Sequence, residues 1–331
     1  MVSAQNGYIK IVELLLSSGA KIDIKNSKKY SVIHIAVYNK KPDVLKEILS
    51  YYENDDEIFY IAGAVLGLHG PDLGDFDLKM HKILMDGVNN IMLFKSSEKD
   101  NSYSGKMDKI IDLLKKGANI NYINKKKKLT PLLSSILNNY IDIANYLIIN
   151  GADVNIKAKG GVSSLALTAA LHNDIDLFNN LIKMGADINS MDDTKLSSVL
   201  MVACKLGKKD YVKILIDNKA DVNLKNIKNE TALISALYFL ASAKNEADIS
   251  NGKEIVKYIV SSGSDINIKW KDQENLTPLM VAVLLNQPDL VEFLLNNGAD
   301  KSLTNDKNIT ALDIAIKNKF TDIEALLKPG N

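Results

Sequence analysis

Short apolar runs with helical spacing alternate with polar stretches along most of the chain, and each run ends at a similar turn signal. Runs such as YLIIN and FLLNN lead directly into Gly151 and Gly298. A helix commonly ends with glycine because the residue after its last turn adopts positive φ, which costs glycine little. The Asp or Asn that follows suits a turn. The pattern therefore predicts a helix before each of these glycines, and likewise before Gly19 and Gly185.

A second helix signal follows each turn. Thr or Ser opens it as an N-cap, and Pro131 and Pro278 stand at the first helical position, where proline loses no needed N–H. The openings are TPLL at 130–133, TPLM at 277–280, TALI at 231–234, TALD at 310–313, SVLM at 198–201 and SVIH at 31–34. A short helix should follow, then a break at Asn139, Gly207 or Asn286, then a second helix.

The turn signal recurs at a nearly fixed interval. GANIN, GADVN, GADIN and KADVN begin at residues 117, 151, 185 and 219, so three successive intervals are 34 residues. The series continues with GSDIN at 263–267 and GADKS at 298–302, and GAKID at 19–23 precedes it. A fixed period in the thirties indicates stacked repeats, in which each unit contacts only its neighbours.

These residues resemble the ankyrin repeat, a unit of about 33 residues that opens with Thr-Pro-Leu-His-x-Ala. The resemblance is closest at 277–300 and 130–155; it is specific over 106–331 and good over 1–52. It implies an all-α fold, an ankyrin-repeat solenoid of stacked helix-turn-helix units with projecting turns.

The motif histidine is kept only as His34. Because that histidine usually supports the opening turn in the family, its loss calls the local stability of the other turns into question. The residues that replace it are Leu133, Met201, Ile234, Met280 and Asp313.

We expect one array over 1–331, with about nine to ten units and an incomplete first unit. The chain begins part-way through a repeat, so either Met1 begins a fragment or the N-terminal cap is unusual. Extra residues at 242–252 are interpreted as a loop between two helices. The pattern is largely lost over 53–105, which is either a long insertion or, as the period favours, a degenerate repeat around Gly87.

Composition narrows the function classes. The net charge is +1 and all 41 basic residues are lysine, because the sequence contains no arginine. Guanidinium is the group that reads guanine or grips phosphate bidentately, so we expect no nucleic-acid partner. Cys204, the single cysteine, is interpreted as a small buried residue, and no run is long and apolar enough for a membrane span.

No secretory leader is visible, but an incomplete N-terminus would hide one. Localisation therefore stays open between cytoplasmic and secreted effector-like.

One cluster of metal-type residues lies in the irregular segment. Its members are His69, Asp72, Asp75, Asp77 and His81. Imidazole and carboxylate bind zinc and related metals, but this spacing matches no metal motif and a solvated loop is favoured. His172 is interpreted as a helix-end residue. No phosphate loop, nucleophile elbow or paired-cysteine pattern is present, so we expect no cofactor and no catalysis.

Lysines concentrate at the turn tips. The run NKKKKL at 124–129 is interpreted as a solvated turn. Trp270, the only tryptophan, stands between Lys269 and Lys271 in another tip, where we expect it to be exposed and to anchor a partner. Lys225 and Lys228, in the preceding tip, complete the predicted partner-binding set.

The predicted function is a protein-interaction scaffold that binds a partner, of unknown identity, on its concave turn and first-helix face. Two alternatives remain. One is an enzyme or metal-dependent activity housed in 57–105. The other is attachment to an anionic surface through the lysine-rich turns, which would equally favour an acidic protein surface.

Overall fold

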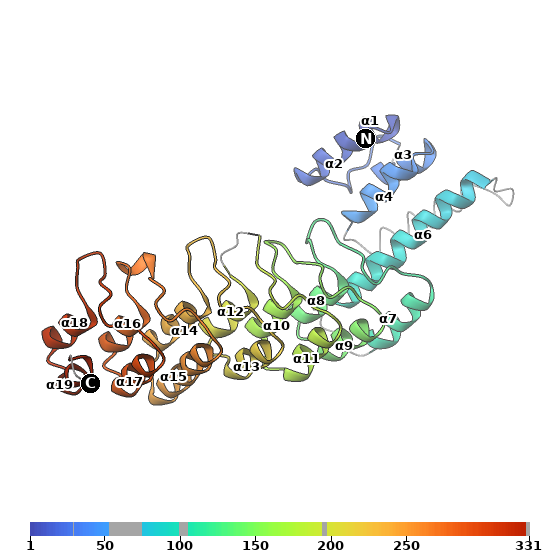
Figure 1. Ribbon diagram of the computed structural model, residues 1–331. Helices are drawn as coiled ribbons and strands as arrows, with labels where there is room; N and C mark the ends of the chain where they lie inside the picture. Colours follow the sequence, from blue (N-terminus) through green and yellow to red (C-terminus); the bar gives the residue numbers. More distant parts are fainter. Residues whose placement is uncertain (29, 53–74, 99–104, 194–196, 329–331) are drawn as a thin grey trace. The chain divides into compact units, whose positions relative to one another are not determined.

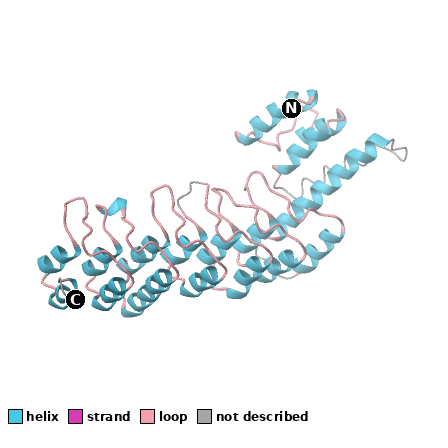
Figure 2. Cartoon of the chain, viewed as in Figure 1, coloured by secondary structure: helices cyan, strands magenta, loops and turns pink. Residues whose placement is uncertain are grey.

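The computed structural model describes residues 1–28, 30–52, 75–98, 105–193 and 197–328. Over these ranges the secondary structure is helical, apart from three isolated β-bridges in turns (Figure 2). The chain divides into two compact units, 1–159 and 160–331. The all-α prediction is therefore confirmed, whereas one continuous array over 1–331 stays a prediction.

Figure 1 labels the helices of each unit. The first unit contains α1 (Val2–Asn6), α2 (Ile9–Ser17), α3 (Val32–Tyr38), α4 (Pro42–Ser50), α6 (Asp75–Ser96), α7 (Lys106–Lys115), α8 (Pro131–Leu137) and α9 (Ile141–Ile149). The second contains α10 (Ser164–Leu171), α11 (Ile175–Lys183), α12 (Val199–Lys205), α13 (Lys209–Asp217), α14 (Ala232–Ala241), α15 (Glu246–Ser261), the 3₁₀ turn η1 (Lys271–Gln273), α16 (Pro278–Leu284), α17 (Pro288–Asn296), α18 (Ala311–Asn318) and α19 (Thr321–Leu327).

The predicted helix starts and breaks are confirmed. Thr277 Oγ1 accepts a hydrogen bond from the Met280 N–H at 3.3 Å, with Pro278 as the first helical residue. The breaks at Asn139, Gly207 and Asn286 take positive φ, as a reversal between two helices requires.

Most opening turns keep a side-chain cap where the motif histidine is missing, but Thr231, at the turn of Ile234, makes no such hydrogen bond. His34 Nδ1 accepts from the Ser31 N–H at 3.2 Å, the support expected of this residue. Asp313 supplies the same support to Thr310 at 2.8 Å through its carboxylate, and burial holds the others in place. In each of four turns without the histidine, the cap hydroxyl accepts the N–H three residues on; the caps are Thr130, Ser198, Thr277 and Thr310.

In four turn signals, the asparagine at the fifth position joins one repeat to the next. Its Oδ1 accepts the backbone N–H of the aspartate at the third position of the next signal. The pairs are Asn121 with Asp153 at 2.7 Å, Asn189 with Asp221 at 2.9 Å, Asn223 with Asp265 at 2.7 Å and Asn267 with Asp300 at 2.9 Å. We call this series the asparagine ladder. It gives the repeated five-letter signal a physical purpose beyond ending a helix.

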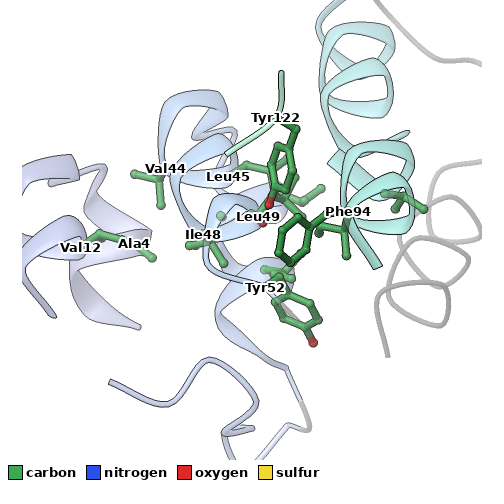
Figure 3. Packing of buried hydrophobic residues seen from close by; sticks show 14 residues of the cluster. Ala4, Val12, Val44, Leu45, Ile48, Leu49, Tyr52, Phe94 and Tyr122 are labelled. Carbon is green, nitrogen blue, oxygen red and sulfur yellow. Dashed lines mark hydrogen bonds between the residues drawn. The ribbon is translucent and has the colours of Figure 1, made fainter. Parts of the chain in front are cut away.

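The core of the first unit gathers α4, α6 and the turn before α8 (Figure 3). Phe94 of α6 is 1 % exposed and meets the Tyr122 ring edge-on, with 6.4 Å between ring centres. The Tyr122 hydroxyl donates to the Leu49 carbonyl at 3.2 Å. Burial of these side chains fixes α6 against α4.

The irregular segment contains one long helix where the sequence analysis placed a degenerate repeat around Gly87. Gly87 lies inside the 22 residues of α6, so it ends no helix, and that interpretation of Gly87 is wrong. A Cβ at Gly87 would lie 2.5 Å from Leu49 Cδ1, so this glycine serves the close approach of α6 to α4. Residues 53–74 and 99–104 lie outside the described part of the chain.

The extra residues at 242–252 also differ from the prediction. They are not a loop, because α15 begins at Glu246 and has 16 residues, while only 242–245 separate it from α14. Asn245 caps α15 by accepting the Asp248 N–H at 2.9 Å. Gly252 then lets α15 pack against α14, since a Cβ there would meet Leu240 Cβ at 3.1 Å.

The ladder predicts that Asn223→Ala destabilises the second unit by about 1 kcal/mol, because it removes the acceptor for Asp265 and the donor to the Gly263 carbonyl. Urea unfolding followed by the fluorescence of the single tryptophan measures the change. Asn223→Asp is the control: it keeps the acceptor, so we expect it to lose less. Equal losses in the two variants would contradict the role of the acceptor.

Cys204 should serve as a second reporter of this unit. It is fully buried, as the sequence predicted, and burial raises the pKa of its thiol, which further suppresses the reactive thiolate. We expect no reaction with Ellman's reagent in the folded protein and reaction on the same urea transition as the fluorescence. Leu206→Cys in a Cys204→Ala background, an exposed position, should react at once.

Candidate interaction surface of the second unit

In four consecutive repeats of the second unit, the first helix exposes the same sequence position to solvent, the seventh residue after the N-cap. These first helices are α12, α14, α16 and α18, and they pack side by side in that order. The residues, called the inner row, are Lys205, Tyr238, Leu284 and Lys317. Tyr238 is 48 % and Leu284 47 % exposed. Two apolar side chains flanked by lysines thus form one strip.

Aromatic and cationic groups meet at Tyr238. Lys205 Nζ lies 5.3 Å from the centre of the Tyr238 ring, and the Trp270 ring contacts the same ring edge-on with 6.1 Å between centres. Both contacts suit an aromatic ring, whose face attracts cations and whose edge attracts another ring's face. They restrain an exposed tyrosine, so less side-chain entropy is lost if a ligand orders it.

Trp270 itself is buried, which contradicts the expected exposed anchor. Its side chain is 8 % exposed, and its Nε1–H donates to Glu230 Oε1 at 3.2 Å. The other oxygen of Glu230 accepts from Asn226 Nδ2 at 2.8 Å. A turn tip is covered by the neighbouring turn and by the helix beneath it, so a large ring there joins two repeats instead of facing solvent.

The predicted lysines of these turns are all exposed. We call Lys225, Lys228, Lys269 and Lys271 the tip lysines. Lys269 Nζ donates to the Thr304 carbonyl of the next turn at 2.8 Å, and Lys271 begins η1. Ile227, between Lys225 and Lys228, is 66 % exposed, an apolar tip that the sequence analysis did not single out.

Tyr238 was also missed by the sequence analysis. The available signal was its equivalence to Lys205 and Leu284, seven residues after a Thr or Ser cap. A count along each repeat would have found it. Its contact with Trp270, 32 residues further along, could be found only in the structure.

Candidate metal and histidine sites receive no support within the described residues, which contain no group of three metal-binding side chains. His69 and Asp72 lie outside those residues, and Asp75, Asp77 and His81 belong to the first turns of α6, where only the backbone is described. His172 ends α10, as predicted. None of the described helices has both the length and the hydropathy of a membrane-spanning segment.

Comparison with known proteins decides the family. The pattern of three tandem ankyrin repeats matches residues 166–245 and 244–331, and single ankyrin repeats match 1–27 and 127–159. The chain belongs to the ankyrin-repeat family. Ankyrin repeats are generally protein-interaction modules, and the family is typically non-catalytic.

Individual relatives match over shorter stretches. Ankyrin repeat protein FPV031 of Fowlpox virus is 42% identical over 87 residues, which are 25% of this chain and 23% of that protein. Human protein phosphatase 1 regulatory subunit 27 is 38% identical over 87 residues, 26% of this chain and 54% of that protein. The chain thus spans about a quarter of the length of FPV031 and about half of the length of regulatory subunit 27.

Among solved structures, the human ASB11 ankyrin repeat domain superposes with a TM-score of 0.52 at 20% identity. The match covers 72% of this ankyrin-repeat chain and 98% of that domain. At this identity the likeness shows the fold alone.

The burial of Trp270 predicts that Trp270→Ala lowers stability by about 3 kcal/mol, because it leaves a large cavity and removes the partner of Glu230. Trp270→Phe keeps an aromatic ring but loses the hydrogen bond and part of the packing, so it should cost less, about 1 to 2 kcal/mol. Circular dichroism melting measures both. An unchanged melting temperature for Trp270→Ala would mean that the ring is exposed after all.

Proposed function

We propose that this ankyrin-repeat protein is a non-catalytic scaffold, and that its partner binds across the inner row and the tip lysines of the second unit. The observation that carries the proposal is the exposed pair Tyr238 and Leu284, set between Lys205 and Lys317 on successive helices. Tyr238 and Leu284 remain about half exposed once the repeats have stacked. A partner that covers them gains the hydrophobic free energy that folding leaves unused.

The chemistry of this strip favours a partner segment with apolar side chains flanked by carboxylates. Tyrosine is a frequent binding anchor, because it offers a large contact area with few rotatable bonds. Lys205 and Lys317 would pair with carboxylates at the rim. The tip lysines would attract the same acidic segment from a distance and speed its association.

Trp270 takes a different part in this proposal. It stays in the site as a positioning residue. Its ring packs against the Tyr238 ring, and its burial fixes the turn tip that carries Lys269 and Lys271. One relative, protein phosphatase 1 regulatory subunit 27, is named as a regulatory subunit of another protein. That name fits a binding function for this chain.

The proposal predicts that Tyr238→Ala with Leu284→Ala weakens partner binding by about a hundredfold, since two interface anchors at about 1.5 kcal/mol each are removed. The wild type and the double variant, immobilised side by side, are incubated with lysate of the source cells. Quantitative mass spectrometry then identifies proteins retained by the wild type and lost from the variant. The affinity of such a protein, purified, is measured for both.

Met184→Ala is the matched control, because Met184 is an equally exposed apolar residue at the end of α11, a second helix. It should retain the partner. Because Tyr238→Ala also removes a ring contact of the buried Trp270, the melting temperature of each variant is measured and binding is compared well below it. Retention of the same proteins by the double variant would refute the inner row as the site. The immobilised wild type is also incubated with anionic lipid vesicles. If it retains these vesicles but no protein, and salt abolishes the retention, attachment to an anionic surface through lysines is favoured.

A further inference from the structure

The members of the inner row are spaced as the stacked first helices are. One member stands on each of α12, α14, α16 and α18, at the same position of the helix, and these helices pack side by side. The axes of packed helices lie about 8 to 10 Å apart, so neighbouring members of the row are separated by about that distance at their Cα atoms. A ligand that lies along the row must therefore present one side chain to it at each such interval.

The row runs along the foot of the projecting turns. In the second unit the turns rise on the side of the first helices (Figure 1). The ring of Trp270, which belongs to one of these turns, lies edge-on to the Tyr238 ring with 6.1 Å between the ring centres. The turns thus border the row on one side, and a ligand beside them is guided across the first helices instead of along a single helix.

A β-strand does not match this row. Consecutive side chains of a strand point to opposite sides, so the side chains on one side recur every two residues, about 6.6 Å apart. Strand addition also requires a free sheet edge. Within 160–193 and 197–328 the structure has no strand that could offer one, because the bridges of Met191 with Ser198 and of Trp270 with Leu276 are isolated.

An α-helix matches the row only in part. Seven residues, about two turns, advance about 10.5 Å, which is more than the spacing of the packed helices. Each such step also rotates the side chain by about 20° around the helix. Over the three steps from Lys205 to Lys317 the excess length reaches at least about 1.5 Å and the rotation about 60°, so the contacts at the two ends of the row lose register together.

A polyproline II segment keeps its register along the row. It has three residues per turn and a rise of about 3.1 Å, so every third side chain points to the same side, about 9.3 Å further on. This distance lies within the spacing of the packed helices, and no rotation accumulates. The backbone of such a segment stays solvated, so the row need not offer it hydrogen-bond partners. Aromatic side chains such as Tyr238 are also typical of sites that bind this conformation.

The two ends of the row favour carboxylates on the ligand. Lys205 and Lys317 are exposed, and Lys205 Nζ lies 5.3 Å from the centre of the Tyr238 ring, which keeps its charge beside the row. Asp313 lies one turn before Lys317 on α18, and its carboxylate accepts the N–H of Thr310 at 2.8 Å and the Thr310 hydroxyl at 2.6 Å. A ligand carboxylate at each end pairs with one lysine, while the apolar side chains between them cover Tyr238 and Leu284.

We propose that the inner row binds a proline-rich segment of the partner in the polyproline II conformation. Two apolar side chains, three residues apart in that segment, lie over Tyr238 and Leu284. A carboxylate three residues beyond each of them pairs with Lys205 or Lys317. This inference rests on the proposed function of the inner row, and it adds the conformation of the partner segment and the spacing of its side chains.

Fluorescence anisotropy with synthetic peptides tests the spacing. The probe is fluorescein-labelled Glu-Pro-Pro-Leu-Pro-Pro-Leu-Pro-Pro-Glu. The matched peptide, Glu-Pro-Leu-Pro-Pro-Pro-Leu-Pro-Pro-Glu, has the same composition with its leucines four residues apart. At about 0.15 M salt we expect saturable binding of the probe to the full chain, and binding at least tenfold weaker for the matched peptide, because its leucines point to different sides. No binding of the probe, or equal binding of the two peptides, would overturn the inference.

Variants of the protein test where the probe binds. Leu284→Ala should weaken its binding about tenfold, whereas Met184→Ala, an equally exposed position on a second helix, should leave it within about twofold. Lys317→Gln should weaken it about threefold, but should not change the binding of a probe in which glutamine replaces both glutamates. The melting temperature of each variant is measured, and binding is compared well below it. Equal weakening by Leu284→Ala and Met184→Ala would contradict binding at the row.

A helical peptide separates this inference from the proposed function. It is alanine-rich, with two leucines seven residues apart and a glutamate seven residues beyond each of them. If this peptide binds in a manner that Leu284→Ala weakens and the proline-rich probe does not bind, the inference is wrong and the proposed function stands. If the proteins retained from the lysate are also retained by the double variant of Tyr238 and Leu284, the proposed function itself fails.

Discussion

Nearest-neighbour stacking is the constraint on which the rest of this structure depends. A pair of helices of seven to ten residues cannot bury its apolar sides alone, so each pair requires the next one at a fixed distance. The asparagine ladder sets that distance, because each Asn side chain accepts a backbone N–H from the following repeat. The five-letter signal recurs since it performs three tasks at once: it ends a helix, turns the chain and joins two repeats.

The first unit shows how the same constraint is met where the repeat pattern is lost. The long helix α6 takes the place of a neighbour: Asn90 on it accepts the Asn119 N–H at 2.6 Å, the bond that a turn asparagine makes elsewhere. Ser97, just after α6, accepts from Ser134 of α8 at 3.1 Å. Gly87 permits the close packing on α4. A helix of different length can therefore continue a stack if it offers the same hydrogen-bond acceptors.

Function is left to the side chains that remain exposed after stacking. In the second unit these include the inner row and the tip lysines. Because the chain has no arginine, every cationic contact relies on lysine, which attracts anions without the fixed two-point geometry of guanidinium. This composition suits acidic segments better than base-specific recognition. The buried Trp270 shows the converse, since a residue that stacking does use is withdrawn from solvent.

The sequence by itself determined the family, the helix pairs, their caps and breaks, and the burial of Cys204, because these follow from local signals repeated at a fixed period. Only the tertiary structure decided which side chains face solvent at the turn tips, since a tip is covered by its neighbour some 30 to 40 residues away. It also decided that 246–252 is helical, that Gly87 is a packing glycine, and that Tyr238 contacts Trp270. Each of these depends on contacts between segments far apart in the chain, which no local pattern records.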